Sequence, residues 1–140
     1  MTPLPDAQAD AAVLLVSSQE ADHSCLHRLL DQSRWRLRHA RTLRGALRLL
    51  AEEPVAVLIG DAALPDDGWK GLLAATLALP CPPSVVISSH RADERLWAEV
   101  LNLGGYDVLL APFEAGEVLR VLRSARHEYH RRLEPSLVTA

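Results

Sequence analysis

Lysine, cysteine and aromatic residues are scarce in this sequence of 140 residues, and each scarcity narrows the range of functions. Lys70 is the only lysine, so chemistry that depends on a lysine ammonium has one candidate. Cys25 and Cys81 are far apart and have no Cys-x-x-Cys spacing, which argues against the common zinc and redox motifs. We expect both to be partly buried free thiols in a reducing cytoplasm rather than a disulfide.

Long apolar runs are also missing. No stretch approaches the ~20 apolar residues needed to cross a bilayer. The segment before Val13 has neither the basic region nor the apolar run of a signal peptide. The formal net charge of -3 gives no support to a nucleic-acid or membrane surface. We therefore expect a soluble cytoplasmic protein that binds neither nucleic acid directly nor a membrane.

The apolar content that is present is enough for one compact domain. Hydrophobic residues make up 49% of the chain and charged residues 24%, an ordinary balance for a globular protein. A chain of this length suits a single domain. We predict a flexible tail over residues 1–11, a domain over residues 12–133 and a second tail over residues 134–140.

The apolar pattern predicts five strands that alternate with five helices. Runs that are apolar at almost every position indicate strands covered on both faces, as in a parallel sheet. Spacings of three and four indicate amphipathic helices. The predicted strands are residues 13–16, 35–40, 55–59, 84–87 and 106–110, and each is followed by a helix, the last over residues 114–133. We predict a parallel sheet with helices on both faces.

Function in such a fold is expected at the carboxyl ends of the strands, because ligands of open parallel sheets bind there. The side chains at or just after those ends include Ser17, Ser18, Asp61, Ser88 and Ala111. These five positions form the predicted pocket.

Three segments of the chain resemble the receiver domain of bacterial two-component response regulators, over roughly residues 12–133. VAVLIGDAALPDDGW matches the family's third strand, its phosphoacceptor aspartate (here Asp61) and the proline four residues on. PPSVVISSH matches the fourth strand with its hydroxyl residue, here Ser88. GGYDVLLAPFEAGEVLRVL matches the fifth strand, the Lys-Pro-Phe corner and the last helix. The resemblance implies a flavodoxin-like, three-layer α/β/α fold of CheY-like type with strand order 2-1-3-4-5.

The departures from that family remove most of its reactive residues. Ser17 and Ser18 stand where the family has two acidic residues that hold magnesium, Ala111 replaces its lysine, and Val108 replaces its aromatic switch residue. Magnesium requires carboxylate ligands to compensate its dehydration, and hydroxyls are poor substitutes. A phosphoryl group on Asp61 would add about −1.5 to −2 charge with no metal or ammonium to neutralise it. We expect weak or absent magnesium binding and no cofactor.

Several side chains leave alternatives open. Asp61 could be a phosphoacceptor or a loop residue bonded to nearby backbone amides, and the second is favoured. Glu20, Asp66 and Asp67 could supply a replacement carboxylate, but are better explained as helix-start and turn residues. Two histidine pairs on helices, His23 with His27 and His127 with His130, could each supply half of a metal site. The alternative that these are surface histidines is favoured. The clustered arginines are expected to lie on solvated helix faces, some paired with acids.

The resemblance implies a signalling role rather than catalysis. We expect a degenerate receiver (a pseudo-receiver) that acts as a phosphorylation-independent protein-interaction module. Only EPSLVTA follows Leu133, so we expect output through protein contacts, with a histidine kinase, a downstream signalling protein or a second copy as partner. The family's output surface places the contacts at Arg95, Trp97, Glu99, Asp107, Arg120, Arg123 and His127. The alternatives are a conventional phosphoacceptor that phosphorylates itself from a kinase or small phosphodonor, and small-ligand binding in the strand-end pocket.

Overall fold

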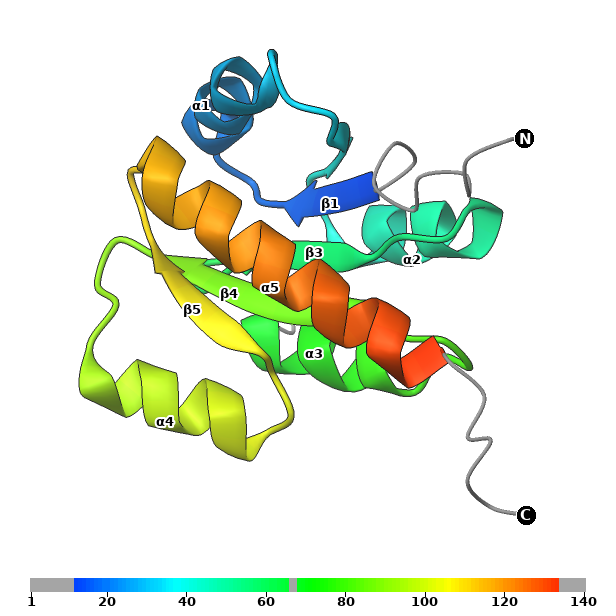
Figure 1. The fold of residues 1–140 in the computed structure, drawn as a ribbon. Coiled ribbons are helices and arrows are strands. Elements are labelled where there is room, and N and C mark those ends of the chain that lie inside the picture. The colour runs from blue at the N-terminus through cyan, green and yellow to red at the C-terminus, as the bar shows by residue number, and fades with distance from the viewer. Residues whose placement is uncertain (1–11, 66–67, 134–140) are drawn as a thin grey trace, which may run out of the picture.

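Figure 1 shows the computed structural model, which describes residues 12–65 and 68–133. The two predicted tails and the Asp66–Asp67 turn lie outside the described residues. Strands and helices alternate along the described chain, as the apolar pattern predicts. The elements are β1 (Ala12–Val16), α1 (Glu20–Leu30), β2 (Arg36–Ala40), α2 (Leu43–Glu52), β3 (Val57–Asp61), α3 (Gly68–Leu77), β4 (Ser84–Ser89), α4 (Glu94–Asn102), β5 (Asp107–Leu110) and α5 (Ala115–Leu133).

The five strands form one sheet in the order β2-β1-β3-β4-β5, and every neighbouring pair is parallel. The predicted flavodoxin-like order is therefore confirmed. Every residue of β1 and β3 is buried because these strands lie inside the sheet and are covered on both faces. β2 is an edge strand and only its last residue, Ala40, is buried. This explains the alternation of apolar and arginine residues in its sequence.

Two hydrophobic clusters lie on opposite faces of the sheet. Alternate residues of each strand point to opposite faces, so Val13 and Leu15 join one cluster while Leu14 and Val16 join the other. The first cluster contains the apolar stripes of α1 and α5. The second contains buried residues of α2, α3 and α4. The result is the predicted three-layer arrangement (Figure 1).

Local sequence signals set several helix ends. The Thr42 hydroxyl accepts a hydrogen bond from the Gly45 N–H at 3.0 Å and caps α2. The Glu114 carboxylate accepts from the Gly116 and Glu117 N–H groups, so this residue precedes α5 as its cap rather than beginning the helix. After α4, Gly104 has φ of +101°, a conformation that glycine adopts without strain.

Three further findings concern the end of β3, the corner after β5 and the helices. The strand predicted over residues 55–59 spans Val57–Asp61, so Asp61 is the last residue of β3 rather than a loop residue. The Ala111–Pro112 peptide bond is cis, in the corner that follows β5. Over the described ranges, no helix has the length and apolar character required to cross a membrane.

Candidate functional site

The carboxyl ends of β1, β3, β4 and β5 bring four of the five predicted pocket residues to one edge of the sheet. Asp61 and Ser88 are register partners on neighbouring strands. Ser17 follows β1 directly and Ala111 follows β5. The four residues are 0 to 4% exposed, so the edge is closed to solvent at these side chains. Ser18, the fifth predicted residue, has an exposed side chain.

Asp61 is held by hydrogen bonds at both carboxylate oxygens. Its Oδ1 accepts from the Ala63 N–H at 3.0 Å, which is the turn-type bond that the sequence favours. Its Oδ2 lies 3.3 Å from the Ser17 hydroxyl. Ser88 contributes through its backbone, because its carbonyl accepts from the Ala62 N–H at 2.7 Å and fixes the chain beyond Asp61.

A second buried carboxylate, from Asp22 in the first turn of α1, reaches the same hydroxyl. The Ser17 Oγ donates to Asp22 Oδ2 at 2.8 Å, and Asp22 is 6% exposed. Sequence reasoning considered Glu20, Asp66 and Asp67 as replacement carboxylates and missed Asp22. A signal for it exists: Asp22 lies four residues before the buried Leu26, on the same helix face.

The two carboxylates compete for one donor. A serine hydroxyl has a single hydrogen, and the distances favour donation to Asp22 over Asp61. The lone pairs of the Ser17 Oγ in turn accept from the Gln19 N–H at 3.0 Å. The exposed imidazole of His90 has its Nε2 3.9 Å from Asp22 Oδ1. The site is thus rich in acceptors and poor in donors and cations.

The position of the family's lysine is filled by the buried methyl group of Ala111. Lys70 does not replace it, because its ammonium pairs with Glu99 Oε2 on α4 at 2.6 Å. Across the part of the chain that the structure describes, no group of three His, Cys, Asp or Glu residues is arranged to hold a metal ion.

His23 also lies beside this site, and the prediction of a surface histidine is wrong for it. The side chain is 3% exposed because it lies three residues before Leu26, on the buried face of α1. Its Nε2 is 2.9 Å from the Ser17 carbonyl oxygen, and its Nδ1 is 2.7 Å from Nδ1 of His39 on β2. Sequence reasoning did not connect these two histidines, because their contact crosses from a helix to an edge strand.

The partners of His23 define its tautomer. A carbonyl oxygen only accepts, so His23 Nε2 carries the hydrogen and donates to Ser17. In a neutral ring, Nδ1 then accepts, and the His39 Nδ1–H donates to it. Burial and the nearby positive potential of His23, Arg41 and His27 lower the pKa of His39 below 6.5. His39 is therefore neutral at neutral pH, and its contact with His23 connects the end of β1 to β2.

The predicted contact residues lie on α4, β5 and α5 with different exposure. Arg95, Arg120, Arg123 and His127 are exposed, and Trp97 is 51% exposed despite its large apolar ring. Glu99 and Asp107 are less exposed than these residues, and both already have partners. Lys70 pairs with Glu99, and the Val108 N–H donates to Asp107. These residues remain predicted contacts.

Many of the clustered arginines pair with acids, as predicted. Arg36 and Arg38 both pair with Glu53, Arg41 pairs with Glu20, and Arg131 and Arg132 pair with Glu128. The two cysteines are free; Cys25 is half-buried, but Cys81 is exposed rather than partly buried, because it lies in the proline-rich segment between α3 and β4.

Comparison with known proteins places this geometry among signalling domains. The signal receiver domain of an HD domain-containing protein from Pseudomonas fluorescens Pf-5 is 32% identical, with a TM-score of 0.78 over 87% of this chain and 98% of that one. KdpE, a transcriptional regulatory protein of Mycobacterium tuberculosis, is 36% identical over 61% of this chain and 38% of its own length. An NtrX-like response regulator of Rickettsia bellii is 28% identical over 81% of this chain and 24% of its own length.

The chain therefore spans about a quarter to two fifths of the length of the curated relatives that it matches. A receiver domain protein of CheY-like type from Methanospirillum hungatei, 18% identical with a TM-score of 0.76 over 88% of this chain and 98% of that one, has the same fold. No family model matches the sequence.

Proposed function

The chain belongs to the family of response regulator receiver domains, and from that membership we propose that it is a two-component signalling domain whose interactions do not depend on phosphorylation of Asp61. The observation that carries the proposal is the pairing of two buried carboxylates with one hydroxyl. Asp61 and Asp22 both reach Ser17, and no ammonium group lies among the residues described at this edge.

The electrostatics of this site oppose phosphorylation. Phosphoryl transfer depends on positive groups that neutralise charge as it develops on the phosphoryl oxygens. Here an incoming phosphoryl group meets the carboxylate of Asp22 as well as that of Asp61, and the methyl group of Ala111 supplies no compensation. The negative charges repel one another in a poorly solvated site.

Magnesium does not fit the donor set as folded. The ion requires near-octahedral oxygen coordination, with carboxylates to compensate its dehydration. Asp22 and Asp61 each already bond to Ser17, and the side chain of Ser18 is exposed. A magnesium ion would have to break these hydrogen bonds before it could be held. We expect isothermal titration with MgCl2 to show no binding tighter than millimolar.

The proposed action is protein binding rather than catalysis. The surface of α4, β5 and α5 carries Trp97 and the exposed basic residues, and it would contact a histidine kinase, a downstream signalling protein or a second copy in the cytoplasm. A neighbour of the same fold, the beryllofluoride-activated NtrC4 receiver domain, is a dimer. That neighbour is 24% identical and shares the fold.

Incubation with acetyl phosphate and magnesium tests the proposal directly. We expect the intact mass of the protein to remain unchanged, while a phosphorylation-competent receiver domain treated in parallel gains a phosphoryl group. The Asp61→Asn variant is the matched control. A phosphoryl mass increase in the natural chain that disappears in Asp61→Asn would identify a conventional phosphoacceptor and overturn the proposal.

A further inference from the structure

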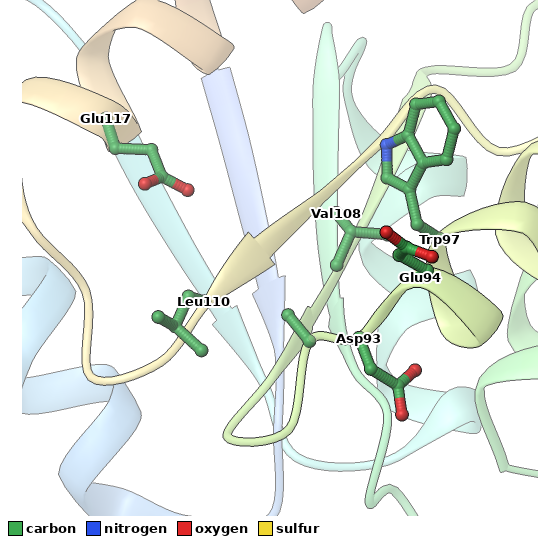
Figure 2. A pocket seen from close by; sticks show the side chains of 7 residues that line it. Asp93, Glu94, Trp97, Val108, Leu110 and Glu117 are labelled. Carbon is green, nitrogen blue, oxygen red and sulfur yellow. The ribbon is translucent and has the colours of Figure 1, made fainter.

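A cleft of about 340 Å³ opens between α4 and β5 and is bounded on one side by the start of α5. Its volume lies within the ~300–1,000 Å³ range of small binding sites. Figure 2 shows Glu94 and Trp97 on α4, Val108 and Leu110 on β5 and Glu117 on α5 around this cleft. The lining residues are Ala92, Asp93, Glu94, Trp97, Val108, Leu110 and Glu117.

The cleft has an apolar surface that the fold leaves uncovered. Trp97 and Leu110 are each 51% exposed, and Val108 between them is half-buried. Val108 is also the position where the family has an aromatic residue, so β5 contributes only a small branched side chain here. Apolar side chains that gather at a concave surface with a polar rim are typical of an interaction site.

The rim of the cleft is acidic. Asp93, Glu94 and Glu117 line it, and no lysine or arginine does. The ion pairs between described acidic and basic residues use other carboxylates, such as those of Glu20, Glu53, Glu99 and Glu128. Asp93 accepts a hydrogen bond from the Leu96 N–H as the cap of α4, so the positive end of this helix offsets part of its charge. Positive charge on a partner would complement the carboxylates of this rim.

We propose that this cleft receives an aromatic side chain of a partner protein that is flanked by arginine or lysine residues. The inference rests on the proposed function and specifies the partner's chemistry. The ring would pack against Trp97, Val108 and Leu110, and the flanking cations would pair with Glu94 and Glu117. Aromatic and arginine residues are the commonest anchors of protein interfaces. Two clefts that faced each other directly in a symmetric contact would offer each other no cation, because no lysine or arginine lines them.

Peptide titration followed by NMR tests this chemistry. The full chain is labelled with ¹⁵N, and the indole N–H signal of Trp97 is identified by its loss in Trp97→Phe. The probes are acetyl-Lys-Leu-Phe-Arg-Lys-amide, the same peptide with alanine in place of phenylalanine, and acetyl-Glu-Leu-Phe-Glu-Glu-amide. We expect saturable shifts of the Trp97 signal with the first peptide and at least about tenfold weaker binding of the other two, which is ~1.4 kcal/mol.

Two variants examine the two halves of the proposal. Val108→Phe fills the cleft with a ring of the chain's own and is expected to weaken binding of the first peptide by about tenfold. Glu94→Gln combined with Glu117→Gln is expected to weaken it and to reduce its dependence on salt. Leu103→Ala, at an exposed apolar position outside the cleft lining, is the matched control and should leave binding unchanged.

Equal binding of the acidic peptide, or undiminished binding by a Val108→Phe variant that retains the natural chain's dispersed spectrum, would overturn the inference. The titrations contain neither phosphodonor nor magnesium. A negative peptide result would therefore refute this inference and say nothing about phosphorylation of Asp61. Phosphorylation of Asp61 would refute the proposed function without changing the peptide result.

Discussion

Ser17 connects two parts of the site at the scale of single residues. Its hydroxyl reaches Asp22 and Asp61, and its carbonyl accepts from His23. An acidic residue at this position would place a third carboxylate beside the other two. The serine therefore makes the site compatible with folding in the absence of a cation, because a hydroxyl can donate where a carboxylate would repel.

The histidine pair predicts that stability depends on pH. Burial is the main cause that lowers the pKa of His39 below 6.5, followed by the potential of His23, Arg41 and His27, with Glu20 opposing. The folded state thus binds fewer protons than the unfolded chain. The stabilisation from neutral His39 is complete above pH 6.5 and is lost as the pH falls through the lower, folded pKa.

Urea unfolding from pH 7.5 to 5 measures this effect. As the pH is lowered below about 6.5, we expect the urea midpoint of the natural chain to decrease more steeply than that of His39→Asn. The asparagine amide retains a donor for His23 Nδ1 but does not titrate, so the difference between the two curves isolates His39. Identical pH dependence of the two proteins would contradict the assignment.

At the scale of elements, close packing between β3 and α3 determines the position of Asp61. Gly60 precedes Asp61, and a Cβ at this glycine would lie 2.6 Å from Cδ2 of Leu72, which is fully buried. We expect Gly60→Ala to lower the free energy of unfolding by about 1–3 kcal/mol through overpacking. Chemical denaturation followed by circular dichroism gives the value.

Leu72→Val removes the obstructing methyl and provides the control. The single change is expected to cost about 0.5–1.5 kcal/mol, as for the loss of one buried methylene. In the double variant the added and removed groups nearly balance, so its destabilisation should be smaller than the sum of the two singles. Strict additivity would show that contact with Leu72 is not what requires glycine at position 60.

The elements were largely predictable from sequence because their signals are local. β1 and β3 have nearly unbroken apolar runs, and Thr42, a residue type favoured as a helix cap, precedes α2. The site was less predictable because its decisive contacts join segments far apart in the chain. Ser17 meets Asp61 across 44 positions, and His23 meets His39 across 16. Helical spacing from Leu26 could have indicated that Asp22 and His23 are buried, but not which partners they meet.

At the scale of the whole molecule, the fold of a receiver domain is preserved while the charges of its site are not. The strand order, the cis bond at Ala111–Pro112 and the placement of Asp61 at the end of β3 are all present. None of these features requires the acidic pair or the lysine, because the sheet is held by apolar packing on both faces. The structure thus separates the scaffold from the chemistry that the scaffold carries in its family.

This separation predicts that a few side chains are enough to restore metal binding. We expect Ser17→Asp, Ser18→Asp and Ala111→Lys, combined in one protein, to make its stability depend on magnesium. Without the ion, the carboxylate added at position 17 lies beside Asp22 and Asp61 and repels them, so the variant should unfold at lower denaturant than the natural chain. With magnesium at 100 times its dissociation constant, binding should raise the free energy of unfolding by about 2.7 kcal/mol.

Denaturation curves with and without MgCl2 measure both states of this variant. The natural chain is the first control and should show no magnesium-dependent shift of its unfolding midpoint. Adding Asp61→Asn to the triple variant is the second, and should reduce the shift because a ligand carboxylate is lost. A folded triple variant whose unfolding midpoint does not change with magnesium would show that the geometry of this edge has changed along with its charges. In that case Asp22, whose carboxylate reaches position 17 from α1 in the natural chain, is the first group to replace.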